Sequence, residues 1–280
     1  MLGLSKPDEK DNGGGGQPTE VRAFSRLDEI RLKARLIEAS RKTNFPEFSG
    51  DGEYLVHYPV HDLVKNLGTR EDDSTNTFTA RLLLLLESRP LVGQRVYEAV
   101  VQRVVKCYWR NYEGHEDRFI PGYLVNDVLR LWRTFCVNYE ATTEERPAEK
   151  RAKRQLKNYK LRHSRLLTCY SGLAYLLGVY EANETVRIED AVAMVQASPT
   201  ERLSWIAKQF AAASSDVDEV LSIYGRFLER TAANEDELIA QITRGERLSG
   251  LDQPQFGDAV FRLLRKIGSN GNLLYRMIVV

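Results

Sequence analysis

The chain has 280 residues, a formal net charge of +1 at pH 7 and 42% hydrophobic residues. This length allows one large domain or two ordinary ones, each with its own core. Overall neutrality argues against a generic nucleic-acid coat, whereas the uneven distribution of charge fits a local basic surface. Residues 1–18 lack the apolar segment of a signal peptide, and the run Leu82–Leu86 is too short to cross a bilayer. We therefore expect a soluble, cytoplasmic protein without a membrane partner.

The amino-terminal quarter of the chain is predicted to contain a disordered leader, two helices and a short β-like segment. Residues 1–20 are rich in glycine and charge, so we expect a disordered leader. A helix is predicted over residues 21–41, and residues 53–60 form a short β-like segment. A helix over residues 61–67 should end at Gly68, before a polar loop over residues 69–76.

Apolar residues at helical spacing dominate the rest of the sequence. Ser198, Pro199 and Glu201 form a capping pattern that marks the start of one helix. The sequence therefore predicts a mainly α protein, a helical bundle with at most a small remnant β element near the amino end. The other helices are expected over residues 77–88, 94–112, 121–140, 149–181, 216–232, 235–244 and 255–267.

Cysteine and histidine spacings do not predict a metal or redox site. Cys107, Cys136 and Cys169 lie far apart inside apolar helical patterns, so we expect reduced packing residues. His57 and His61 are four residues apart, but the proline between them disfavours the continuous helix that a shared site would need. We find no nucleophile motif and no phosphate-binding glycine loop.

The predicted helix over residues 121–140 has a polar face without Lys or Glu. Arginine, asparagine, aspartate and threonine make directional hydrogen bonds, which suits the binding of nucleotide or polynucleotide phosphates. The alternative is an internal network, because Asp127 and Arg130 are spaced for an ion pair within the helix. At about 100° per residue, six side chains share an arc of about 140°: Asn126, Asp127, Arg130, Arg133, Thr134 and Asn138.

A basic segment follows, with eight basic and no acidic residues from Lys150 to Arg165. Within it, Asn158, Arg162 and Arg165 share one side of a helix, and they would meet the first arginine face if the two helices pack side by side. Phosphate contact with RNA or DNA is one interpretation of this segment. An ordinary solvated helix face is the other.

Several spaced motifs carry a resemblance to a known family. NDVLRLWRTFCVNYE from Asn126 is followed by KNYKLRHSRLL from Lys157, and both are preceded by Asp72, Asp73, Ser74 and the helix TARLLLLLESR. This combination resembles a bacterial nucleotidyltransferase-like family of the DNA polymerase β superfamily, over roughly residues 24–180. After the leader (1–20), the resemblance divides the chain into a remnant of the nucleotidyltransferase-like α/β part (21–70), a helical bundle with arginine faces (71–182) and a C-terminal helical region (183–280).

Catalysis in that superfamily needs a Gly-Ser turn and a strand with two alternating carboxylates, because two metal ions clamp the triphosphate and the attacking hydroxyl. The segment Phe24–Glu29 has Ala23 in the glycine position, and adjacent acids on a helix do not share a face. Asp51 and Glu53 have the alternating spacing, but the glycines around Asp51 mark a turn equally well. Either the chain is a family member without catalysis, or its catalytic part lies upstream.

The sequence favours a nucleotidyltransferase-like protein that binds nucleotide or nucleic acid and is catalytically incomplete in this form, with nucleotide or RNA as the expected partner. Its cofactors would be Mg²⁺ and a nucleoside triphosphate if the family activity is retained. The alternative is a non-catalytic helical module that binds a partner protein. No catalytic or metal-binding residue is assigned, and the predicted phosphate-binding residues are Asn126, Asp127, Arg130, Arg133, Asn158, Arg162 and Arg165.

Overall fold

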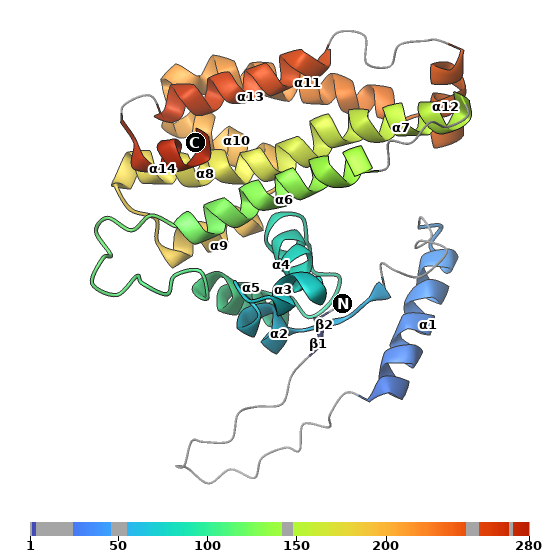
Figure 1. Ribbon diagram of the computed structural model, residues 1–280, viewed down its shortest axis with the longest axis horizontal. Helices are drawn as coiled ribbons and strands as arrows, with labels where there is room; N and C mark the ends of the chain where they lie inside the picture. The colour runs from blue at the N-terminus through green and yellow to red at the C-terminus, as the bar shows by residue number, and fades with distance from the viewer. Residues whose placement is uncertain are drawn as a thin grey trace. The chain divides into compact units, whose positions relative to one another are not determined.

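The computed structural model describes residues 2–3, 25–45, 55–141, 148–244, 252–268 and 271–279. These residues lie mainly in helices and their connections (Figure 1). The β structure in this part of the chain is a two-residue parallel pair, β1 (Leu2–Gly3) beside β2 (Tyr58–Pro59). The prediction of a mainly α protein with a small β element is therefore confirmed. The remainder of the predicted leader and the candidate carboxylates Asp51 and Glu53 lie outside the described residues.

The chain divides into two compact units, residues 1–81 and residues 82–280. In the first unit, α1 begins at a capping box formed by Ser25 and Asp28, and Glu29 lies 2.8 Å from Nδ1 of His57. The core of this unit includes Leu55, Val60, Leu63, Leu67 and Phe78. Its helices are α1 (Arg26–Lys42), α2 (Val60–Lys65), α3 (Glu71–Ser74) and the first part of α4 (Thr77–Leu86).

A buried ion pair joins three helices of the first unit. Arg81 and Asp72 are 0% and 1% exposed, and the guanidinium donates to both carboxylate oxygens of Asp72. Arg81 also donates to the carbonyl oxygen of Leu63 at 3.1 Å, and the Thr77 hydroxyl donates to Asp72 at 2.9 Å. The segment predicted as a polar loop contains the short helix α3. Asp72 on this helix faces inward, where it accepts hydrogen bonds from Arg81.

The second unit is a helical bundle around α8 (Leu166–Asn183) (Figure 1). From Leu167 to Val179 every α8 residue except Tyr170 is buried. A helix that is apolar on all sides requires such enclosure. The other helices of this unit are α5 (Gln94–Lys106), α6 (Gly122–Ala141), α7 (Ala148–Lys160), η2 (Leu161–Arg165), α9 (Ile188–Gln196), α10 (Pro199–Gln209), η3 (Ala211–Ala213), α11 (Ser214–Thr231), α12 (Glu235–Thr243), α13 (Asp252–Gly268) and α14 (Leu273–Val279).

Two features of this bundle differ from the predicted elements. The single long helix predicted over residues 149–181 is interrupted by η2, a π-helical turn. Helices α9 and α14 were not predicted, and both are short; Asn272 caps α14 by accepting a hydrogen bond from the Tyr275 N–H at 3.1 Å. Arg187 is the N-cap of α9, and its backbone N–H donates to the Asp190 carboxylate at 2.8 Å. A boundary between two helical regions was predicted between residues 182 and 183. Helix α8 before this point packs against α9, α10 and α13 after it, within the second unit.

A fully buried arginine stabilises the centre of the second unit. Arg202 is 0% exposed and donates to the carbonyl oxygens of Met194 at 2.8 Å and Leu86 at 3.2 Å. It also donates to the Ser171 hydroxyl at 3.4 Å. Met194 and Leu86 lie in the last turns of α9 and α4, where the helix dipole favours a cation. Burial, followed by the nearby charge of Arg89, lowers the pKa of Arg202 to about 10, so the guanidinium remains charged at neutral pH.

Candidate functional site

The polar residues predicted on the arginine helix, which is α6, divide between solvent and interior. Asn126, Arg130 and Arg133 are exposed, and their spacing places them on one side of the helix. Asp127 is only 9% exposed and accepts a hydrogen bond from the Tyr108 hydroxyl at 2.8 Å. Asp127 therefore belongs to an internal contact, while the other three side chains stay accessible to a ligand.

The accessible side of α6 extends beyond these three residues. Tyr123 is 55% exposed and Val137 is 64% exposed, and both lie on the same side by helical spacing. We call this surface the exposed α6 face: Tyr123, Asn126, Arg130, Arg133 and Val137. Arg133 makes no side-chain hydrogen bond or ion pair with any described residue. The face therefore presents an aromatic ring, an amide and two guanidinium groups to solvent.

The second predicted arginine face is split by the π-helical turn. Arg162 donates to the Asn158 side chain at 3.2 Å, as their predicted spacing requires. Arg165 instead pairs with Glu87, and its guanidinium lies 5.3 Å from the ring centroid of Phe135. A π turn holds more residues than an α turn, so Arg165 is rotated away from Arg162.

The two arginine faces do not converge, although α6 packs against η2 and α8. Phe135, which contacts Arg165, lies roughly opposite Arg130 and Arg133 around α6. Trp132 packs edge-on against Tyr170 of α8 at 6.0 Å between ring centroids. These contacts turn the exposed α6 face away from the helix that carries Arg165.

The basic segment on α7 has an acidic partner helix. Lys160 Nζ lies 2.8 Å from the Glu235 carboxylate on α12. This hydrogen bond lowers the pKa of Glu235, and the charges of Lys157 and Lys153 act in the same direction. Three of the basic residues predicted for nucleic-acid contact thus act on an exposed carboxylate of the same unit. Beneath it, α7 and α12 pack through Ala152, Leu156, Leu238 and Ile239.

A basic surface that the sequence reasoning missed lies on α5. Arg95, Arg103 and Lys106 are exposed, and their side chains form no hydrogen bond or ion pair within the described parts of the chain. The signal was present in the sequence, because valines at helical spacing mark the core side of this helix and the three cations lie opposite. The buried valines are Val100, Val101, Val104 and Val105.

The chain leaves α5 at Lys106 and forms a series of turns before α6, although a helix was predicted as far as residue 112. Tertiary hydrogen bonds hold these turns. Trp109 Nε1 donates to the Val186 carbonyl oxygen at 2.9 Å, and the Phe119 N–H donates to the Thr185 hydroxyl at 3.0 Å. Thr185 in turn donates to the Glu116 carbonyl oxygen at 2.6 Å. The connection is therefore anchored to the segment between α8 and α9.

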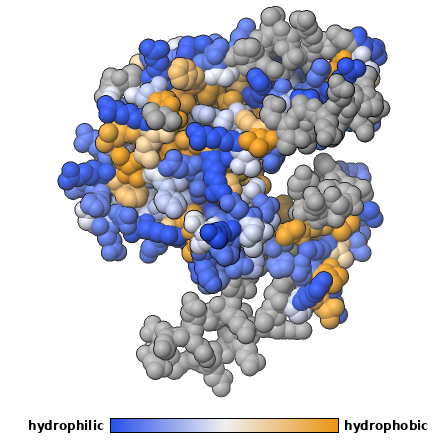
Figure 2. Space-filling view, viewed as in Figure 1, coloured by the Kyte–Doolittle hydropathy of each residue, from blue (hydrophilic) through white to orange (hydrophobic). Residues whose placement is uncertain are grey.

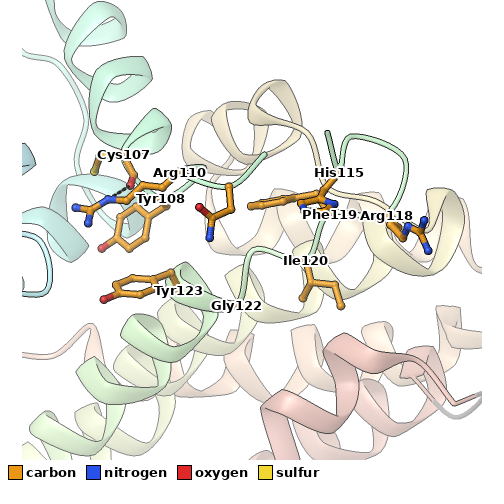
Figure 3. A pocket seen from close by; sticks show the side chains of 10 residues that line it. Cys107, Tyr108, Arg110, His115, Arg118, Phe119, Ile120, Gly122 and Tyr123 are labelled. Carbon is orange, nitrogen blue, oxygen red and sulfur yellow. Dashed lines mark hydrogen bonds between the residues drawn. The ribbon is translucent and has the colours of Figure 1, made fainter. Parts of the chain in front are cut away.

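These turns line an open pocket of about 510 Å³ between the end of α5 and the start of α6 (Figure 3). We call it the α5–α6 pocket. The rings of Tyr108 and Tyr123 lie together on one part of its wall, with their centroids 6.5 Å apart. Arg110 and Arg118 lie at opposite ends of the view in Figure 3. The wall also includes Asn111, His115 and Phe119.

Polar side chains cover much of the visible face, with apolar patches between them (Figure 2). No described helix combines the length and apolar character needed to cross a membrane. The three cysteines are free, as expected. Burial raises the pKa of the Cys169 thiol to about 12, with the Glu87 charge adding to the effect, so this thiol stays protonated.

No family model, curated protein or solved structure matches the chain. Within the described ranges, no group of three or more His, Cys, Asp or Glu side chains is arranged to hold a metal ion. The site presents cations, aromatic rings and amides, which are suited to binding an anionic, ring-containing ligand.

Proposed function

We propose that this protein binds single-stranded RNA through a surface that joins the basic side of α5, the α5–α6 pocket and the exposed α6 face. One observation carries the proposal: five accessible cations on these elements have no hydrogen-bonded or ionic side-chain partner among the described residues. Cations of this kind bind phosphates by releasing condensed counterions. They are Arg95, Arg103, Lys106, Arg118 and Arg133.

The distribution of charge favours single strands over a uniform duplex contact. The connection between α5 and α6 also carries Glu113, Glu116 and Asp117, all exposed, so the surface has two basic flanks with a mixed centre. The centre contains the exposed ring of Tyr123 and, one turn further along, the amide of Asn126. Unstacked bases bind aromatic rings and amides of this kind, while their phosphates bind cations.

This proposal retains the binding part of the nucleotidyltransferase resemblance, and we assign no catalytic residue. Asn126, Arg130 and Arg133 remain predicted phosphate-binding residues, supported by their exposure. Asp127, through its contact with Tyr108, is better suited to holding the site in shape. Asn158, Arg162 and Arg165 lie outside the proposed surface.

Fluorescence anisotropy with a labelled 20-nucleotide RNA at low salt tests the proposal. The triple variant Arg95→Ala, Arg103→Ala, Lys106→Ala should bind about tenfold more weakly, because three phosphate contacts are lost. The matched control is Lys153→Ala, Lys157→Ala, Lys160→Ala, which removes the same charge from the α7–α12 contact. Its affinity for RNA should stay close to that of the unaltered protein.

Equal losses in the two triple variants would show that only net charge matters and would overturn the proposed surface. Absence of RNA binding at low salt would overturn the proposed function itself. The protein-interaction alternative would then be favoured, with Leu91 and Val92 as apolar contact residues, since they are 88% and 89% exposed beside α5.

A further inference from the structure

We infer that the α5–α6 pocket holds one unstacked nucleotide, with its base against Tyr123 and its phosphate at Arg118. This assignment rests on the proposed RNA binding and specifies which part of the RNA enters the protein. The pocket volume of about 510 Å³ falls within the range of small-molecule sites and accommodates a nucleoside monophosphate.

The tyrosine pair determines where a base can stack. An aromatic ring inserted between two others needs about 7 Å between them, because carbon atoms in contact are about 3.5 Å apart. The Tyr108 and Tyr123 centroids are 6.5 Å apart and their planes are tilted by 55°, so a base does not fit between them. Tyr123 is 55% exposed, whereas Tyr108 is 3% exposed. The base therefore stacks on the open side of Tyr123, with Tyr108 as a fixed support behind it.

The support is held rigidly before any ligand arrives. The Tyr108 hydroxyl donates to the buried Asp127 carboxylate at 2.8 Å, which fixes the ring through α6 itself. The opposite wall is anchored by the hydrogen bonds of Trp109 and Phe119 to the segment between α8 and α9. A site that is already ordered loses less entropy when it binds a ligand. Asp127 is thus a positioning residue for the stacking platform.

Polar groups for the rest of a nucleotide are placed away from the tyrosines. Arg118 lines the pocket, is exposed, and forms no side-chain hydrogen bond or ion pair within the described ranges. Figure 3 shows Arg118 at the far end of the pocket wall from Tyr123. Asn111 also lines the pocket, and its amide offers a donor and an acceptor to a base edge.

Isothermal titration of the full chain with adenosine, cytidine, guanosine and uridine 5′-monophosphates tests this inference, with the free nucleosides and inorganic phosphate as separate titrants. At least one monophosphate should bind more tightly than its nucleoside and than phosphate, and should displace labelled RNA. Tyr123→Ala should weaken monophosphate binding by about tenfold or more, and Tyr123→Phe should retain it, since stacking needs only the ring. Arg118→Ala should weaken the monophosphate but not the nucleoside.

Phe261→Ala is the matched control, because Phe261 is an aromatic residue of α13 that is 51% exposed and lies outside the pocket. It should leave nucleotide binding unchanged. RNA binding that survives Tyr123→Ala, together with no monophosphate binding, would overturn the pocket inference and leave the proposed function standing. Inorganic phosphate binding as tightly as every monophosphate would overturn it too. Monophosphate binding that depends on Tyr123, without any RNA binding, would support the pocket and refute the RNA proposal.

Discussion

At the scale of single residues, burial separates arginines that stabilise the fold from arginines that can bind a ligand. Arg81 and Arg202 are completely buried and hydrogen-bonded, whereas Arg95 and Arg103 are exposed without partners in the described parts of the chain. An arginine in an isolated sequence does not reveal this difference. The carbonyl acceptors of Arg202 come from α4 and α9, at positions 116 and 8 residues away.

Arg202→Met should lower the free energy of unfolding by about 3 kcal/mol or more, because the carbonyl oxygens of Met194 and Leu86 lose their buried donor. Arg202→Lys should recover only part of this loss, since an ammonium group cannot reproduce the fixed fork of a guanidinium. Urea denaturation at pH 7 measures both. Arg262→Met is the control: its ion pair with Glu219 is exposed and is worth about 1 kcal/mol or less. Similar losses for Arg202→Met and Arg262→Met would contradict a structural role for Arg202.

At this scale, the sequence predicted which side of α6 is polar but not which of its polar residues are buried. The helical wheel identified the polar face of α6, and the structure shows that Asn126, Arg130 and Arg133 are exposed. It did not separate Asp127 from them, because the partner of Asp127 is Tyr108, in turns that were predicted to be helix. A wheel describes directions around one helix and contains nothing about what lies beside it.

At the scale of elements, capping and periodicity predicted most helices, and the π-helical turn is the clearest exception. The Ser198 capping box is present, with its N–H donating to Glu201 at 2.6 Å. The turn at η2 places His163 inside the bundle, stacked between Phe227 and Phe256 at 4.9 Å from each ring centroid. Those rings come from α11 and α13, so the local sequence around His163 could not predict the turn.

The contact between α7 and α12 should depend on pH through Glu235. Lys160 lowers the pKa of this carboxyl from its ordinary value of 4.5, so the ion pair contributes fully above that value and is lost as the pH falls through the lowered pKa. Both side chains are largely exposed, which limits the contribution to about 0.5 kcal/mol. Glu235→Gln should therefore reduce the free energy of unfolding slightly at pH 7 and low salt, and not at pH 3.

Denaturation curves at the two pH values, with and without 1 M salt, provide the measurement. Glu237→Gln is the matched control, because it removes an acid from the same first turn of α12 and so isolates the effect of Lys160 from that of the helix dipole. A difference between the two variants that persists at pH 3 or in high salt would contradict an electrostatic origin.

At the scale of the whole molecule, helical periodicity predicted the fold class, but neither periodicity nor composition predicted the site. A net charge of +1 conceals the basic flanks on α5 and α6, because acidic residues elsewhere balance them. The α5–α6 pocket depends on contacts such as the one between Trp109 and Val186, which are 77 residues apart. Periodicity within helices carries no information about such contacts, so the pocket became visible only in the folded chain.

The salt dependence of RNA binding tests whether the uneven charge operates as a phosphate-binding surface. Each phosphate neutralised on a single strand changes the slope of log K against log salt concentration by about −0.7. Five bound phosphates would give a slope of about −3.5, and the α5 triple variant should reduce its magnitude by about 2. Anisotropy titrations between about 50 and 200 mM salt measure both slopes. A slope near zero, or an unchanged slope in the variant, would mean that the α5 cations do not contact phosphates.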